Sequence, residues 1–327
     1  MRYVVRGLHL VFMLLCGAFA AAPVAWAQGS YPDKPIRFVV PYPPGGGTDV
    51  IARIVQGRLS ALLGQTINID NRGGAGGSLG TDLVAKAAPD GYTVLFTLNS
   101  HTVNPAIYAK LPFDTQKDFE PVGLVASLPQ LLAVNPQFAA GTVADVVAAA
   151  KAKPGELSYA SVGVGSPGHL AGELLNLRAG IKTTHVPYRG GGPAVTDVMA
   201  GQVPLLWVSI PAAAQFVKNG KLKAVAVSTV KRSAAFPDVP TVQEAGIADF
   251  EVDSWYAMFV PAKTPRPIID KLNAALNTVL KESEIKERLL AQGSEGVGGP
   301  PEALAKAVAT ELPKWAKLAK DANIKAE

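Results

Sequence analysis

Residues 36–49 read IRFVVPYPPGGGTD: an apolar run rich in β-branched residues, a proline–glycine turn, and polar residues that begin a helical pattern. Residues 43–49 form the first of four such turns. The same succession of strand, turn and helix recurs at a second turn (72–78), a third turn (163–168) and a fourth turn (188–193). A helix N-terminus carries unpaired N–H groups and about half a positive charge, and glycine lets a ligand approach the backbone closely. If these turns face one cleft, they predict that backbone groups bind a small anion there.

Hydrophobic periodicity places the turns within two sets of strands and helices. In the first set, Thr48 or Asp49 and Ser78 are the expected helix caps. Alternating strands and helices predict an α/β fold of mostly parallel sheets flanked by helices, with ligands beyond the carboxyl ends of the strands. We expect strands at 36–40, 67–70, 93–98, 131–134, 157–161, 183–187, 205–208, 224–228 and 255–260. We expect helices at 49–63, 78–87, 143–152, from the third turn to 179, from the fourth turn to about 200, and after Pro265 and Pro300.

The two sets suggest two lobes. The chain passes between them near Ala126–Pro129 and near Phe250–Ser254, where no helical pattern occurs. We therefore predict lobe I from residues 28–127 plus 253–327, and lobe II from residues 128–252. Two crossings make a hinge, which permits closure around a ligand.

The first 27 residues have the pattern of a signal peptide. Arg2 and Arg6 are followed by the apolar stretch Leu8–Ala22 and by Ala25-Trp26-Ala27, a cleavage pattern of small residues. We predict cleavage after Ala27 and a periplasmic location. Attachment as a lipoprotein through Cys16 is the alternative, although the bulky residue before Cys16 fits it poorly.

The amino-acid composition limits the kinds of partner that the chain has after cleavage of the signal peptide. Cys16 is the single cysteine, so the mature chain would need no disulfide. The chain has 31 basic and 26 acidic residues, and cleavage would remove two of the basic ones. This mild balance argues against nucleic acid as a partner.

Two of the turns imitate enzyme motifs. Residues 76–80 fit G-x-S-x-G, but residues 71–75 separate Ser78 from the preceding strand, whereas a nucleophile elbow follows its strand directly. An exported hydrolase using Ser78 remains the alternative function. Residues 163–168 fit the dinucleotide motif G-x-G-x-x-G, yet the next strand ends in His185-Val186-Pro187-Tyr188-Arg189 rather than in an acid.

We expect no catalytic residue, metal or cofactor. His101, His169 and His185 lack a second ligand at helical or turn spacing, and no two carboxylates are placed for acid–base work. His169 lies one turn into the helix that begins at the third turn, where its ring can support that turn. The sequence leaves open whether Arg53, Arg72 or Arg189 contacts a ligand.

The chain resembles the substrate-binding proteins of tripartite tricarboxylate transporters, also called Bug receptors. The resemblance covers essentially the whole mature chain in order. It rests on residues 41–49, 71–77, 90–93, 111–114 with 117–119, 161–166 with His169, 185–190, 240–241 with 244–246, and Trp255 before Pro261-Ala262.

The resemblance implies a two-lobed fold like that of type II periplasmic binding proteins. It further implies a non-enzymatic receptor that clamps a small mono-, di- or tricarboxylate and delivers it to membrane permease subunits. A sensor or partner-binding receptor is the alternative to an uptake component, and we expect a monomer. The ligand-binding candidates that it suggests are Tyr42, Gly46, Thr48, Asp49, Gly76, Gly77, Asn99, Ser100, Ser161, Gly165, Ser166 and His169.

One stretch departs from the family pattern. Trp207-Val208-Ser209 stands where relatives often read Phe-Asp-Asn. If this strand end lines the cleft, the far end of the ligand is expected to be less polar or aromatic. Alternatively, Trp207 packs in the core of lobe II.

Overall fold

The first third of the described chain alternates strands with helices, as predicted. The computed structural model describes residues 31–139 and 141–326, and the elements below belong to the unit that begins at Lys34. Strand β1 pairs in parallel with both β2 and β3, which brings the turns that follow these strands to one edge. The elements are β1 (Ile36–Val40), α2 (Gly47–Leu63), β2 (Ile67–Asn71), a 3-10 turn (Ala75–Gly77), α3 (Ser78–Ala85), β3 (Thr93–Leu98) and α4 (Ser100–Ile107).

Strand β4 (Phe119–Val134) is much longer than the predicted strand at 131–134. Its first part contains Pro121, Gly123 and Pro129, which disfavour a strand and concealed it in the sequence. Pro121 and Gly123 border a register shift against β9, an irregularity at which a strand tolerates both residue types.

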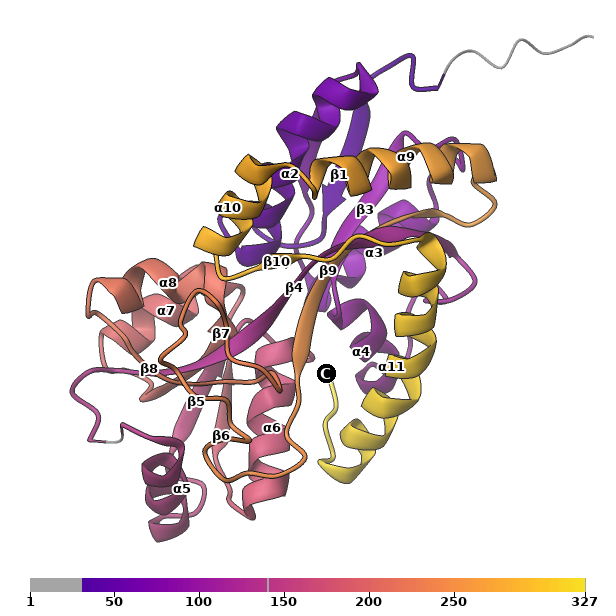
Figure 1. The fold of residues 1–327 in the computed structure, drawn as a ribbon. Coiled ribbons are helices and arrows are strands. Elements are labelled where there is room, and N and C mark those ends of the chain that lie inside the picture. Colours follow the sequence, from indigo (N-terminus) through magenta and orange to yellow (C-terminus); the bar gives the residue numbers. More distant parts are fainter. Residues whose placement is uncertain (1–30, 140, 327) are drawn as a thin grey trace, which may run out of the picture. The chain divides into compact units, whose positions relative to one another are not determined.

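Strand β4 also changes its partner along its length. Residues 119–129 pair antiparallel with β9 (Asp253–Pro261), whereas residues 130–134 pair antiparallel with β7 (Leu205–Ser209). In Figure 1, β4 runs from the β1–β3 region into the β5–β7 region. The strand order is β2-β1-β3-β9-β4-β7-β5-β6, with β8 and β10 also paired to β4.

The middle of the chain supplies the second set of elements. Strand β5 pairs in parallel with β6 and β7. Helix α8 was not predicted, because it follows β7 directly, with no loop between the strand and the helix. The elements are α5 (Val143–Ala152), β5 (Ser158–Ser161), α6 (Pro167–Ala179), β6 (Thr184–Pro187), α7 (Gly191–Met199), β7, α8 (Ile210–Lys218) and β8 (Lys223–Val227).

The last part of the chain contains more helix than predicted. After β9 come α9 (Arg266–Val279), α10 (Ser283–Ala291), β10 (Glu295–Gly296) and α11 (Pro301–Asp321), and α10 was missed. Helix α4 was missed as well, because it contains Pro105. Helix α11 packs Leu304 against the core around β1, β3 and β9, and Trp315 against the core around Trp207.

The α/β prediction is confirmed, although the sheet is more mixed than expected. The parallel pairs lie among β1, β2 and β3 and among β5, β6 and β7, whereas β4 and β9 pair antiparallel. The exchange of partners on β4 falls at residues 129–130, beside the predicted crossing; the division into two lobes stays a prediction. Among residues 31–139 and 141–326, no helix combines the length and apolar character needed to span a membrane.

Candidate ligand-binding site

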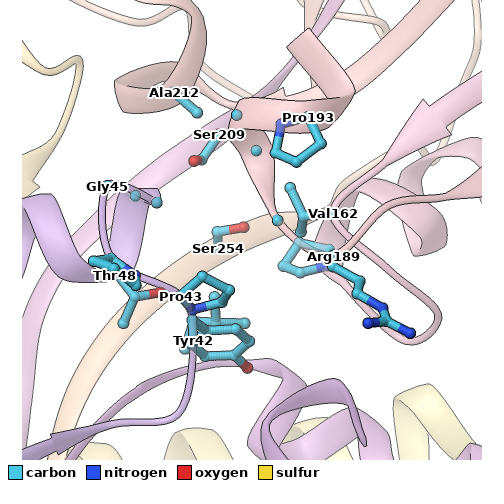
Figure 2. Close-up of a pocket in the computed structure, with 18 of the residues that line it drawn as sticks. Tyr42, Pro43, Gly45, Thr48, Val162, Arg189, Pro193, Ser209, Ala212 and Ser254 are labelled. Atoms are coloured by element: carbon cyan, nitrogen blue, oxygen red, sulfur yellow. The ribbon is translucent and has the colours of Figure 1, made fainter. Parts of the chain in front are cut away.

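A cavity of about 220 Å³ lies between the first and fourth turns. The labelled residues of the first turn face those of α7 and β7 across it (Figure 2). One water needs about 10–15 Å³ of such volume, so the cavity has room for a small organic ligand. Its lining consists of Tyr42, Pro43, Pro44, Gly45, Gly46, Gly47, Thr48, Leu98, Gln130, Val162, Pro167, Arg189, Gly190, Gly191, Gly192, Pro193, Ser209, Ala212, Ser254 and Tyr256.

Four helices begin at this cavity. Gly46 is the N-cap of α2, Gly190 the N-cap of α7 and Ser209 the N-cap of α8, while Pro167 is the first residue of α6. All four residues line the cavity. Because each helix start carries unpaired N–H groups and partial positive charge, the cavity has a positive potential without needing many cationic side chains.

The first turn is held by Asp49. Its carboxylate accepts hydrogen bonds from the Gly45 N–H at 2.9 Å, from Arg53 Nε at 3.0 Å and from Asn71 Nδ2 at 3.2 Å. Burial opposes ionisation, but the bonds from Arg53, Gly45 and Asn71 lower the pKa of Asp49 overall. Helix α2 begins at Gly47, so the expectation that Thr48 or Asp49 is its N-cap was wrong. Asp49 instead fixes the loop before the helix.

The hydroxyl of Tyr256 lies between the first turn and the start of α8. It hydrogen-bonds to Ser209 and Thr48, and burial raises the pKa of Tyr256 far above its ordinary value. A Cβ atom placed on Gly47 would lie 2.5 Å from the Tyr256 hydroxyl oxygen and 2.7 Å from Ser209 Oγ. Only glycine fits at this position without displacing these hydroxyls.

Two buried polar residues connect the strands beside the cavity. Gln130 on β4 donates from Nε2 to Ser254 Oγ on β9 at 2.5 Å, and its backbone N–H donates to Ser228 Oγ at 2.8 Å. Gln130 and Ser254 are each 2% exposed and line the cavity. Because β4 exchanges β9 for β7 at Gln130, this wall of the cavity is built on the strand that joins both parts of the sheet.

Three of the predicted ligand-binding residues line this cavity: Tyr42, Gly46 and Thr48. Ser100 supports Tyr42 through a hydroxyl–hydroxyl hydrogen bond. Burial raises the pKa of Tyr42 to about 12, only partly offset by the bond to Ser100. Asn99 is buried behind this layer and donates to the Asp253 carbonyl at 3.0 Å.

Gly76 of the second turn and Gly165 of the third turn lie near Asn104 of α4, and of these two turns Pro167 alone belongs to the cavity lining. Asn104 Nδ2 donates to the Gly76 carbonyl at 3.1 Å. A Cβ on Gly76 would lie 3.5 Å from Asn104 Oδ1, and one on Gly165 would lie 3.3 Å from the same oxygen. Gly77 lies beside Tyr42, since its Cβ would be 2.9 Å from the Tyr42 hydroxyl. These predicted glycines therefore pack around the cavity-lining layer.

The third turn is stabilised by a buried polar cluster. Ser166 is the N-cap of α6, and its side chain accepts from the His169 N–H at 3.3 Å. His169 Nδ1 accepts from the Gly165 N–H at 3.1 Å, which confirms that this ring supports the turn. His185 stacks on His169 with 3.9 Å between ring centroids and shares a 2.6 Å hydrogen bond with Ser161 Oγ. Ser161, Ser166 and His169 thus hold the loop together.

Burial keeps both stacked histidines neutral. It lowers the pKa of His169 to about 4. For His185, burial and the neighbouring His169 lower the pKa to about 3. Among the described residues, no group of three or more His, Cys, Asp or Glu side chains could hold a metal ion.

Trp207 packs in the core rather than at the cavity. It is 1% exposed and stacks on Phe250 with 5.9 Å between ring centroids. Of the stretch Trp207-Val208-Ser209, Ser209 alone belongs to the lining. An aromatic ligand end that rests on Trp207 is therefore not supported.

The three arginines whose contact with a ligand the sequence left undecided differ in their positions. Arg189 lines the cavity and is exposed. Arg53 pairs with Asp49 at 3.0 Å, and Arg72 with Asp70 at 2.9 Å; neither lines the cavity. The fourth turn was predicted from the sequence, and of its residues Arg189 alone was left open as a ligand contact. The position of Ser209 at the carboxyl end of β7 could have indicated it as a lining residue. No sequence motif marks Gln130, Ser254 or Tyr256, because these residues lie inside strands.

The Ser78 hydroxyl has the surroundings of a structural group. The N-cap of α3 is Gly77 and not the expected Ser78. Ser78 is 5% exposed, and its Oγ accepts from Asn104 Nδ2 at 3.3 Å. This contact supplies no general base.

We expect Ser78→Ala to lower the free energy of unfolding by about 1 kcal/mol or less, since one neutral hydrogen bond is lost. Ligand affinity should not change. Denaturant unfolding and calorimetry check both points. If the wild type hydrolyses an ester and Ser78→Ala does not, the hydrolase alternative would be correct.

The α/β arrangement matches that of periplasmic binding proteins of known structure. The periplasmic binding protein BugD superposes with a TM-score of 0.85 at 35% identity, over 91% of this chain and 100% of that one. The Rpa4515 protein of R. palustris with adipate superposes with a TM-score of 0.87 at 35% identity, over 90% and 99%. Protein BugT of Bordetella pertussis is 36% identical over 322 residues, 98% of each chain.

Residues 51–324 match the model of the tripartite tricarboxylate transporter family receptor. The chain belongs to this family.

Proposed function

We propose that this chain is a periplasmic solute-binding receptor. It binds a small organic carboxylate in the cavity between the first and fourth turns and delivers it to a tripartite tricarboxylate-type membrane transporter, without catalysing a reaction. Family membership and the adipate held by the 35% identical R. palustris protein support this function. The start of four helices at one cavity is the observation that carries it.

The proposal includes the predicted architecture of the mature chain. Residues 1–27 are a cleavable signal peptide; they lie outside the described residues. Residues 28–127 with 253–327 form one lobe and residues 128–252 the other, and the monomer closes around its ligand. The cavity lining supports this division, because Thr48 comes from the first segment and Ser209 from the second.

The predicted contacts fall into two groups in this proposal. Tyr42, Gly46 and Thr48 contact the carboxylate directly or through water. The other nine predicted residues hold the loops and hydroxyls that surround it. Residues of the fourth turn and Ser209 supply contacts from the opposite side.

Isothermal titration calorimetry on the mature chain tests the proposal. The panel contains mono-, di- and tricarboxylates and aromatic acids, and the protein is unfolded and refolded first to remove any ligand that co-purifies. We expect at least one small carboxylate to bind with 1:1 stoichiometry. If no member of the panel binds while the protein turns over an ester or a hydroxy acid, the receptor function is excluded.

A further inference from the structure

The start of helix α8 differs from that of an ordinary serine-capped helix. Ser209 is its N-cap, and Pro211 has no N–H, so the Ala212 N–H is the group that a serine cap would bind. In the described part of the chain, however, the Ser209 side chain makes no hydrogen bond to the start of α8. Ala212 lines the cavity (Figure 2). Because the first N–H groups of a helix have no partner within it, this uncapped start presents the Ala212 N–H to a ligand.

The Ser209 hydroxyl bonds to Tyr256 instead. The Tyr256 hydroxyl shares hydrogen bonds with Ser209 and with Thr48 of α2. A Cβ on Gly47 would lie 2.5 Å from the Tyr256 hydroxyl oxygen and 2.7 Å from Ser209 Oγ, so both oxygens lie against the start of α2. Serine is one of the best N-cap residues. The bond to Tyr256 therefore takes the place of a cap that the sequence would otherwise form.

Tyr256 is held firmly enough to keep Ser209 from capping the helix. Tyr256 is 2% exposed, and its strand pairs with Leu98 of β3 on one side and with Ala126 of β4 on the other. Its second hydroxyl partner, Thr48, is buried as well. A buried hydroxyl that loses its partners is unfavourable, so burial of the Tyr256 hydroxyl favours the bonds to both side chains.

We infer that Tyr256 is a positioning residue for ligand binding. Its hydroxyl holds the Ser209 side chain away from the Ala212 N–H and thereby keeps the start of α8 open to an anionic group. The inference rests on the proposed function, because it assigns a role to one residue of the same cavity. A tyrosine in the cavity wall thus determines how many backbone N–H groups face the ligand.

Amide hydrogen exchange measured by NMR tests the inference without a ligand. In Tyr256→Phe the Ser209 side chain is released and should cap α8, so we expect exchange of the Ala212 N–H to slow at least five-fold. Gly47→Ala should have the same effect, because its Cβ displaces both hydroxyl oxygens. This second variant decides the matter if Tyr256→Phe does not fold. Unchanged exchange at Ala212 would overturn the inference.

The sign of a second substitution provides another test, by calorimetry with succinate, adipate and citrate as probes. We expect Tyr256→Phe to bind each probe that the wild type binds at least ten-fold more weakly. Ser209→Ala should weaken binding in the wild-type background, where Ser209 is a proposed contact. In the Tyr256→Phe background it removes the new cap and should strengthen binding at least three-fold. If Ser209→Ala has the same sign in both backgrounds, the inference is wrong and the receptor function stands.

Tyr159→Phe is the matched control. Tyr159 is 1% exposed, lies outside the cavity lining and donates to Glu173 Oε1 at 2.7 Å. This variant also loses a buried hydroxyl, so it should lower the unfolding temperature but change the probe affinities less than two-fold. A ten-fold loss of affinity here would count against the inference. Silence of all three probes would count against the receptor function, and exchange at Ala212 would then decide the role of Tyr256 by itself.

Discussion

Gly168→Ala is expected to lower the free energy of unfolding by about 2–3 kcal/mol. Gly168 lies in the first turn of α6, where a Cβ would come within 2.4 Å of the Trp207 carbonyl oxygen and 3.0 Å of its carbonyl carbon. These are backbone atoms of β7, which is paired on both sides with β4 and β5, so they cannot move aside easily. Denaturant unfolding of variant and wild type gives the difference.

Gly57→Ala is the matched control for this substitution. Gly57 lies in the interior of α2 and is exposed, and apart from its chain neighbours and the backbone of its own helix no atom of the described residues lies within 4 Å of its ideal Cβ position. Alanine there should raise the free energy of unfolding by about 0.5–1 kcal/mol, because glycine weakens a helix interior. Gly168→Ala with wild-type stability would refute the close contact between α6 and β7. The close contact with β7 accounts for Gly168, the last glycine of the G-x-G-x-x-G motif, and a bound dinucleotide is not needed to explain it.

Acidification from pH 7 to pH 5 is expected to lower the free energy of unfolding by several kcal/mol. Burial lowers the pKa of His101 and His169 to about 4, and burial together with His169 lowers that of His185 to about 3. An unfolded histidine titrates near pH 6.5. Between that pH and the folded values, the unfolded state binds more protons, so stability falls as the pH falls. Each histidine contributes a loss of about 2 kcal/mol by pH 5.

Asp253 opposes this trend in part. Burial raises its pKa to about 6, despite the hydrogen bond from Ser127. The folded state therefore takes up this proton at higher pH than the unfolded state does. This proton uptake raises the free energy of unfolding by about 1 kcal/mol between pH 7 and pH 5. The three histidines outweigh it.

His101→Phe separates one histidine from the rest. The His101 ring is 2% exposed and packs among Phe113, Phe119 and Phe259, and among the described residues neither ring nitrogen has a well-formed hydrogen bond. Phenylalanine should keep this packing and raise stability at pH 7 by about 1 kcal/mol. It should also reduce the loss between pH 7 and pH 5 by about 2 kcal/mol. Unfolding curves at pH 7, 6 and 5 check this, and an unchanged pH slope would contradict neutral burial of His101.

Periodicity predicted most of the fold because most strands and helices bury one face. Three of the missed elements have a local cause. Pro105 conceals α4, Pro121 and Pro129 conceal the first part of β4, and α8 follows β7 directly, with Ser209 as the one polar residue at the junction. In such places strand pairing between distant segments overrides the local secondary-structure preference, and hydrophobic periodicity does not reveal that pairing.

The site was harder to predict than the fold. Glycine turns identify where helices begin, so Gly46 and Thr48 were found together with Tyr42. They do not show which turns line a cavity and which pack beside it. Gly165 has a positive φ and a Cβ position only 2.2 Å from Ile107 Cδ1, a packing constraint that looks like a binding motif in the sequence. Gln130 and Ser254 come together only through the pairing of β4 with β9.

The pairing of β4 with β9 also affects how the chain folds. Ser127 pairs with Trp255, so residues 119–129 of β4 lack this partner until β9 has been synthesised, whereas residues 130–134 can pair with β7 earlier. Contacts between such distant segments form slowly, because a long loop must close first. The first part of β4 is therefore expected to stay unpaired until most of the chain exists. This delay suits the proposed export of the chain before it folds, and the pairing that supports the cavity also sets the time at which the cavity can form.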